Sequence, residues 1–230
     1  DYLRKSHIPF VVQGRTEDCD DYAWLDIDNE KAFIDAMDHL VGLGHRKIAY
    51  LGGDPDLNYA WQRRSGYLSA AKTHGCDVLD GYLHDGITDE MAARRAVAEL
   101  LKHPDRPTAI LCVTDAVAIG AIHALAHAGV EVGKDISIIG FDGLPMGEAI
   151  HPGLTTMSQA SYQVGRAVGR IVVAQANETK EANAPASEFS QILWEATLTI
   201  RGSANPPAPK LAVNANPAPK PVTNAKGGIS

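Results

Sequence analysis

Several polar side chains are spaced so that they could bind a ligand rich in hydroxyl groups. Asp142 ends the apolar run "ISIIGFD", and Asp115 ends the similar run "TAILCVTD". Carboxylates accept hydrogen bonds from hydroxyl groups, an arginine donates to them, and an aromatic ring can cover the C–H face of a sugar ring. We therefore expect a site for a polyhydroxylated ligand. Its candidate residues are Asp28, Lys31, Arg63, Asp115, Asp142 and Gln159, with Trp61 as an aromatic platform.

Helix capping is the alternative role for these acids. Asp115 lies directly before an apolar helical segment, where its side chain or that of Thr114 could accept a hydrogen bond from a free backbone N–H group. Both capping and ligand contact therefore stay open for Asp115. For Asp142 we favour ligand contact, because open α/β sheets bind ligands just beyond the carboxyl ends of their strands.

Other chemistries lack the residues that they need. His123 and His127 lie four residues apart and could share a metal ion, but no third ligand is near, so a solvated helix face is the better interpretation. The stretch "LGGDPD" has neither the glycine spacing of a dinucleotide-binding loop nor the Lys-Ser/Thr pair of a phosphate-binding loop. No G-x-S-x-G nucleophile elbow is present. We therefore expect no metal, no cofactor and no enzymatic activity.

Alternating strands and helices would position the candidate residues. Apolar runs predict strands over residues 8–14, 47–53, 108–115 and 136–142. Apolar side chains spaced three to four residues apart predict helices over residues 29–44, 61–75, 90–103 and 116–129, with ends marked by Gly44, Gly75, Pro104 and Gly129. Strands that are apolar throughout, each followed by a helix, are typical of a parallel sheet buried on both faces. The predicted fold class is therefore α/β.

Composition narrows the class of protein further. The 230 residues are 45% apolar and carry a formal net charge of -7, with scattered Lys and Arg, so this chain alone is not expected to bind DNA. No apolar run approaches the roughly 20 residues of a membrane span, and no signal peptide opens the sequence. The odd set of Cys19, Cys76 and Cys112 indicates reduced thiols, with Cys112 in the core. We expect a cytoplasmic protein with no membrane partner.

Four sequence segments, in this order, resemble a known family. They are "DIDNEKAFIDAMDHLVGLGHRKIAYLGG" (26–53), "RRSGYLSAA" (63–71), "PTAILCVTDAVAIGAIHALAHAGVEVGKDISIIGFDG" (107–143) and "HPGLTTMSQ" (151–159). Together they resemble the effector-binding core of LacI/GalR-type bacterial transcriptional repressors, which share the two-lobed fold of periplasmic sugar-binding proteins. The resemblance covers essentially Ile8 to Gly202.

The resemblance implies a homodimer or tetramer in which a small effector, bound between two lobes, changes their angle and so controls DNA binding. Operator DNA would be bound by an N-terminal helix-turn-helix that is absent from this chain. Residues 1–43 and 159–186 would form a DNA-proximal lobe with parallel strands flanked by helices, truncated at its N-terminus. Residues 44–157 and 187–202 would form the distal lobe, and the Pro- and Ala-rich residues 203–230 a flexible tail.

The resemblance also implies roles for individual site residues. Arg63 matches the Arg of the family's R-x-x-G-[YFW] motif, and Asp142 matches the acid of G-[FY]-D that commonly accepts hydrogen bonds from sugar hydroxyls. Gln159 matches the Gln that follows "LTT" at a crossover between the lobes. Ile87 lies where several relatives have an aromatic residue, so we expect Trp61 to take over as the platform.

The sequence thus predicts a ligand-sensing regulator, a repressor of carbohydrate-utilisation genes that responds to a sugar effector. The stretch "FVVQGRTEDCDDYAWLDIDNEKAF" resembles the α-glucoside-responsive branch of the family. The first alternative is a periplasmic sugar-binding protein of a transporter, whose intact gene would carry a signal peptide in place of a helix-turn-helix. The second alternative is an α/β enzyme, for which the sequence supplies no nucleophile.

Overall fold

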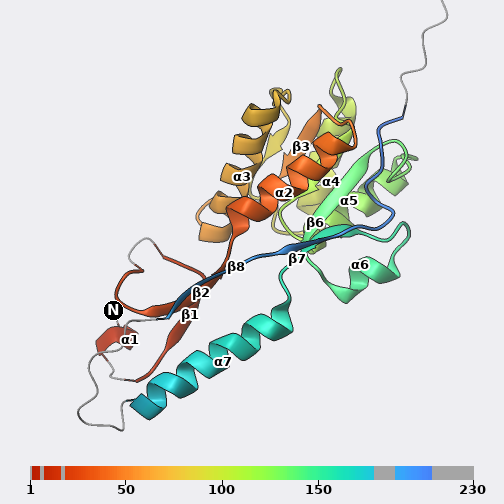
Figure 1. Ribbon diagram of the computed structural model, residues 1–230. Coiled ribbons are helices and arrows are strands. Elements are labelled where there is room, and N and C mark those ends of the chain that lie inside the picture. The colour runs from red at the N-terminus through yellow and green to blue at the C-terminus, as the bar shows by residue number, and fades with distance from the viewer. Residues whose placement is uncertain (1, 6–7, 17–18, 179–189, 209–230) are drawn as a thin grey trace, which may run out of the picture.

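The computed structural model describes residues 2–5, 8–16, 19–178 and 190–208, which form two lobes, each built around its own sheet (Figure 1). The larger lobe holds a six-stranded sheet in the order β4-β3-β5-β6-β7-β9. The smaller lobe holds a three-stranded sheet in the order β1-β2-β8. The predicted α/β class and the two-lobed arrangement are confirmed.

The larger sheet is parallel apart from its last strand. Its strands are β3 (Ile48–Leu51), β4 (Leu83–His84), β5 (Ala109–Cys112), β6 (Ser137–Asp142), β7 (Thr155–Ser158) and the antiparallel β9 (Thr197–Thr199). Side chains of β3 alternate between the two faces, with Ile48 and Tyr50 in one core and Ala49 and Leu51 in the other. Because both faces are covered, β3 and β5 are apolar throughout, whereas β7 and β9 carry Thr and Ser side chains.

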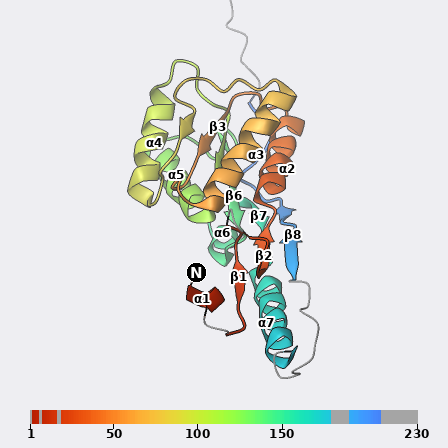
Figure 2. The same ribbon diagram turned by 90° about the vertical axis from the view of Figure 1, so that its left-hand side faces the viewer.

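Two pairs of helices cover the two faces of the larger sheet (Figure 2). Helices α2 (Asn29–Gly42) and α3 (Asn58–His74) pack against each other on one face. Helices α4 (Glu90–Lys102) and α5 (Asp115–His127) pack together on the other. The short helix α6 (Pro145–Ala149) follows β6. No helix in the described part of the chain is long and apolar enough to cross a membrane.

Most helix ends follow the signals in the sequence. Gly75 is the C-cap of α3 with a φ of 61°, a left-handed conformation that glycine adopts without strain. Helix α4 ends at Lys102, ahead of Pro104. The N-cap of α5 is Thr114, whose hydroxyl accepts a hydrogen bond from Val117 N at 3.3 Å. Asp115 therefore does not cap this helix, although capping was one of its two expected roles.

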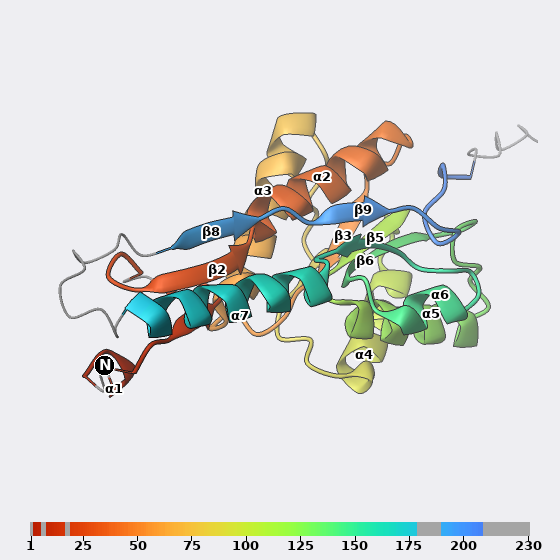
Figure 3. The same cartoon turned by 60° about the horizontal axis from the view of Figure 1, so that its bottom comes forward.

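The smaller lobe packs one long helix against a parallel sheet (Figure 3). Its strands are β1 (Val11–Gln13), β2 (Ala23–Ile27) and β8 (Gln191–Trp194), and its helices are α1 (Tyr2–Lys5) and α7 (Ser161–Glu178). Helix α7 contacts β1 and β2 and buries Val164 and Ile171. The apolar face of α7 is thus largely used within this lobe.

The chain crosses between the lobes from β2 to α2, from β7 to α7 and from β8 to β9. These crossovers place the lobe boundaries differently from the sequence expectation. Helix α2 belongs to the larger lobe, because it packs on α3 and shares a core with Tyr50 and Tyr67, so this lobe starts near Asp28 rather than at residue 44. Residues Gln191–Trp194 belong to the smaller lobe, because β8 pairs with β2.

The expected tail also begins later than residue 203. Ser203 is fully buried, and its hydroxyl donates to the carbonyl of Ile138 at 2.7 Å. The carbonyl of Asn205 lies 2.9 Å from Nε2 of the buried His45 and accepts from the Ser137 hydroxyl at 2.8 Å. Residues up to 205 are therefore fixed to the larger sheet by hydrogen bonds. Most of the predicted tail, residues 209–230, lies outside the described residues.

Candidate functional site

A cavity lies at the carboxyl ends of the parallel strands, where the sequence predicted a ligand site. Its volume is about 260 Å³, and its walls come from the segments that follow β3, β4 and β5. They include Gly53, Asp54, Tyr59, Ile87, Thr88, Asp89, Val113 and Thr114. Both polar and apolar side chains thus line the cavity, as the hydroxyls and C–H faces of a sugar require.

Arg63 lies at the base of this region, in the second turn of α3. Its side chain is buried, with Nε donating to Asn29 Oδ1 at 2.8 Å and Nη1 donating to the carbonyl of Val113 at 2.7 Å. Nη2 makes no hydrogen bond with any residue that the structure describes. A guanidinium has five N–H groups, so Arg63 keeps donors for a ligand.

Two aromatic rings enclose the Arg63 guanidinium. Its Cζ lies 3.5 Å from the ring centroid of Phe141 and 4.7 Å from that of Tyr59. Such contacts stabilise a cation that has lost its water. Burial lowers the pKa of Arg63 to about 10, while the nearby Asp142 opposes this change. The side chain therefore remains a cation at neutral pH.

Asn29 holds the arginine in place and is itself held by Gln62, and neither residue was among the candidates from the sequence. Asn29 Nδ2 donates to Gln62 Oε1 at 2.8 Å and to the carbonyl of Ile27 at 3.1 Å. Both side chains are buried. Asn29 is the first residue of α2, directly after the first crossover, so this network connects Arg63 to the junction of the lobes. Their position in the sequence could have pointed to them, because Asn29 follows the candidate Asp28 and Gln62 precedes the candidate Arg63.

Asp142 and Gln159 come together at the ends of β6 and β7. Gln159 Nε2 donates to Asp142 Oδ1 at 3.1 Å. Burial raises the pKa of Asp142 to about 6. The charge of Arg63 lowers this pKa, the charge of Asp115 raises it, and a hydrogen bond from the Asp115 backbone lowers it. The φ of Asp142 is 126°, a conformation rarely adopted by residues other than glycine and often found at functional sites. Asp142 is the last residue of β6 and Gln159 directly follows β7, the two strands next to β5 in the sheet order, and neither residue is a wall residue of the cavity.

Asp115 has a structural role instead of the two roles that the sequence left open. It is fully buried, and its Oδ1 accepts from the Thr156 hydroxyl at 2.6 Å. Its Oδ2 accepts from Leu144 N at 2.7 Å. Gly140 allows this carboxylate to approach β6, because a Cβ at that position would collide with Oδ1. Asp115 thus fixes the loop that follows Asp142.

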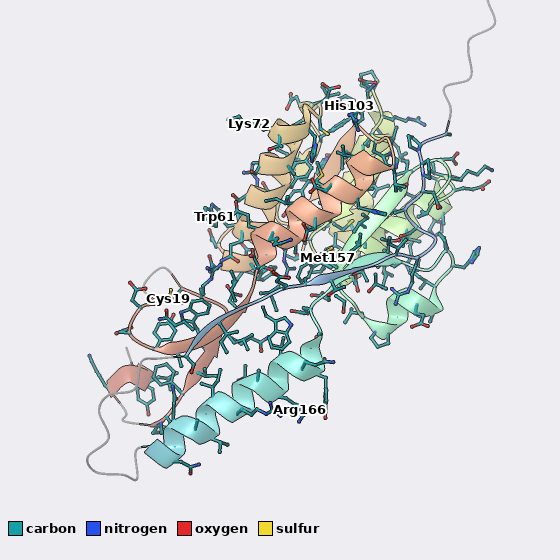
Figure 4. All side chains as sticks on the ribbon, viewed as in Figure 1. Cys19, Trp61, Lys72, His103, Met157 and Arg166 are labelled. Atoms are coloured by element: carbon teal, nitrogen blue, oxygen red, sulfur yellow. The ribbon has the colours of Figure 1, made fainter. Side chains whose placement is uncertain are left out.

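Of all the candidate residues from the sequence, Ile87 alone is a wall residue of the cavity, and its side chain is buried there. Trp61 is 60% exposed on the outer side of α3 and is not among the wall residues, so the aromatic wall is Tyr59 instead (Figure 4). Asp28 caps α2 by accepting from Lys31 N at 3.0 Å. Lys31 itself forms a surface ion pair with Asp35 at 2.6 Å.

A hydrogen bond between the lobes lies next to Leu57, one of the wall residues of the cavity. Asn58, the first residue of α3, donates from Nδ2 to the backbone carbonyl of Arg15 in the smaller lobe. Arg15 is held in turn by Asp26, at 3.0 Å from its Nε, and lies over the ring of Trp24. This contact places the segment after β1 next to the start of α3, so both lobes border the site.

Within the described ranges, no group of three or more His, Cys, Asp or Glu residues could hold a metal ion. His123 and His127 are both exposed on α5, and His123 lies 3.4 Å from Glu90. All three cysteines are free thiols, and Cys112 is buried in the core as predicted.

Residues 37–204 match a family model described as a periplasmic binding protein-like domain. The HTH-type transcriptional regulator AglR of Rhizobium meliloti is 34% identical over 222 residues, which cover 95% of this chain and 60% of AglR. The chain therefore spans about three fifths of that regulator.

Solved structures give the same result. A regulatory protein of the LacI family from Chloroflexus aggregans is 34% identical with a TM-score of 0.79, and the match covers 89% of this chain and 71% of that one. The transcriptional regulator CelR, in complex with cellobiose, is 26% identical with a TM-score of 0.75, over 85% of this chain and 58% of CelR.

Proposed function

Because the chain belongs to the LacI/GalR family and is its periplasmic binding protein-like effector domain, we propose that it senses a sugar on behalf of a transcriptional repressor. The observation that carries this proposal is the Arg63 guanidinium, which is held by Asn29 and Val113 near Asp142 at the carboxyl edge of the sheet. A fixed donor group beside an acceptor group matches adjacent sugar hydroxyls.

The groups around the cavity suggest how the sugar is bound. Asp142 accepts hydrogen bonds from ligand hydroxyls, and the free N–H groups of Arg63 donate to them. Tyr59 and Ile87 provide apolar surface for the C–H face of the ring. The resemblance of residues 10–33 to the α-glucoside-responsive branch makes an α-glucoside disaccharide the first ligand to test. The complex of CelR with cellobiose, a β-linked glucose disaccharide, makes cellobiose the second.

Sugar binding between the lobes would change their angle, and this change would be passed to an operator-binding helix-turn-helix in the intact regulator. An operator bound by two helix-turn-helix units requires a homodimer, and we infer this assembly from the family. The apolar face of α7 gives this little support, because Val164 and Ile171 are buried within the smaller lobe. Sedimentation of the intact protein at tens of micromolar should show a dimer, and a monomer alone would contradict it.

The two alternative functions are less well supported. The relatives that match are transcriptional regulators, which does not favour a transporter's binding protein. The same relatives are not enzymes. The effector domain of a cytoplasmic regulator is the remaining interpretation.

A thermal-shift screen tests the proposal directly. The chain is heated with maltose, trehalose, sucrose, cellobiose, glucose or ribose, each titrated to a plateau. A ligand at a hundred times its Kd should stabilise the fold by about 2.7 kcal/mol. Asp142→Asn should reduce the shift from the active sugar, whereas Asp35→Asn in the surface ion pair should not. A stabilising sugar whose effect is equal in both variants would place the site elsewhere, and no shift with any sugar would contradict sugar sensing.

A further inference from the structure

Helices α4 and α5 cover one face of the sheet of the larger lobe (Figure 2). A second cavity lies between these two helices. Its volume is about 500 Å³, and its residues come from α4 between Arg94 and Lys102, from the C-terminal half of α5 and from the segments that follow both helices. These helices return from the carboxyl ends of the strands, so their C-terminal halves lie at the opposite edge of the sheet from the effector site. Apolar side chains, including Val97, Leu101 and Ala124, line the groove.

The charged residues of this groove all have the same sign. Arg94, Lys102 and Arg106 line it together with His127, and no carboxylate does. In the part of the chain that the structure describes, none of the three cations forms an ion pair or a side-chain hydrogen bond. The whole chain carries a formal net charge of -7, so the groove is a local reversal of sign.

We infer that this groove binds an acidic amphipathic helix of a partner protein. The apolar lining requires apolar side chains to cover it, and the cations at its rim require carboxylates. A small inorganic anion would leave the apolar surface uncovered, and the sugar-phosphate backbone of DNA offers few apolar groups to it. Helices that bind in grooves between two other helices use apolar residues at i, i+3, i+4 and i+7. From Arg94 to Lys102 the groove wall is about 12 Å long, which matches roughly two turns of a bound helix.

The test uses a fluorescently labelled synthetic peptide with leucines at i, i+3, i+4 and i+7 and glutamates at most other positions. Its binding to the full chain is measured by fluorescence anisotropy. We expect saturable binding that weakens as the NaCl concentration rises, because exposed charges are screened. The double variant Arg94→Glu/Arg106→Glu should weaken binding by about tenfold or more, because two attractions become repulsions.

Arg95→Glu is the matched control, because Arg95 is also exposed on α4 but does not line the groove. It should change the affinity by less than about twofold, and thermal denaturation of each variant checks folding. Equal binding of a peptide with Gln in place of Glu would overturn the role of charge, and equal binding with Ser in place of Leu would overturn the role of the apolar lining. Tighter binding of duplex DNA would identify a nucleic acid surface instead. If the charge reversal converts a dimer to monomers and leaves the affinity for the peptide unchanged, a second copy of the chain occupies the groove.

Discussion

Arg63 Nε donates a hydrogen bond to Asn29 Oδ1 at 2.8 Å, which ties the buried cation of α3 to the first residue after a lobe crossover. Asn29 uses its own donors on Gln62 and on the carbonyl of Ile27. Arg63 Nε, Asn29 and Gln62 Oε1 are therefore paired with one another, and removing Asn29 leaves the other two groups unpaired at a cost in free energy.

Asn29→Ala should lower the free energy of unfolding by about 1–3 kcal/mol, because Arg63 Nε and Gln62 Oε1 lose their partner in a buried environment. Urea denaturation measures this change. Ser65→Ala is the control, since its exposed hydroxyl lies 3.4 Å from Glu30, and it should change stability by less than about 0.5 kcal/mol. Equal losses in the two variants would contradict a buried network.

Asp142→Asn should weaken sugar binding by roughly 10- to 150-fold, because a hydrogen bond to a charged group contributes about 1.5–3 kcal/mol. Arg63→Lys should weaken it similarly, since lysine cannot keep both fixed hydrogen bonds and also donate to the ligand. Without ligand, Asp142→Asn should alter stability by less than about 1 kcal/mol, because Asp142 is half-buried at the edge of the site. Calorimetric titration measures the affinities. Wild-type affinity in both variants would show that Asp142 and Arg63 do not contact the sugar.

Sugar affinity should rise as the pH rises through about 6, the raised pKa of Asp142, because the ionised carboxylate is the better acceptor. The folded state holds this proton more tightly than the unfolded chain, whose carboxyl titrates near 3.8. Asp142 therefore favours folding below pH 3.8, and this contribution is lost as the pH rises to about 6. Sugar affinity measured between about pH 5 and 8 should rise with pH in the wild type and stay constant in Asp142→Asn. Identical pH profiles in the two proteins would show that Asp142 does not control the affinity.

Tyr59→Ala should weaken sugar binding by about 2- to 30-fold, because the ring packs on Arg63 and lines the cavity. Trp61→Ala is a matched control on the same helix, since Trp61 is exposed and away from the cavity walls. It should leave the affinity within about twofold of the wild type. A larger effect from Trp61 than from Tyr59 would restore the platform that the sequence suggested.

Gly140→Ala should destabilise the fold by more than about 1 kcal/mol, because its Cβ would displace Asp115 Oδ1 from the Thr156 hydroxyl. Gly165→Ala is the control, since a Cβ there meets nothing within 4 Å on α7. Alanine at that helical position should stabilise the protein by about 0.4–1 kcal/mol. Thermal denaturation compares the two variants, and a neutral Gly140→Ala would show that Asp115 can adjust.

The sequence predicted the main strands and helices because their apolar periodicity is local information. It did not predict β2 or β7, and it missed β4, since the two residues Leu83–His84 are too short to show any period. The start of α3 at Asn58 also went unpredicted, because Leu57 makes no side-chain cap. The lobe boundaries depended on which sheet each segment joins, and pairing of β8 with β2 is a long-range property.

Prediction of the site was limited in the same way, because the sequence shows local spacing but not long-range contacts. Arg63 and Tyr59 are four residues apart and share a face of α3, whereas Trp61 is two residues from Arg63 and cannot share it. Helical geometry could therefore have selected Tyr59. The burial of Asp115 could not be predicted in this way, because its partners Thr156 and Leu144 lie far along the chain.

The shortest crossover limits how the lobes can move. Only Glu195 and Ala196 separate β8 from β9, and both strands are hydrogen-bonded into their sheets. Beyond β9, Ser203 and Asn205 fasten the chain to the larger sheet. Two residues span at most about 7 Å, so this link has no slack to lengthen. The lobes can therefore swing about a pivot at these two residues but cannot slide apart, and the largest displacements fall on the atoms farthest from it.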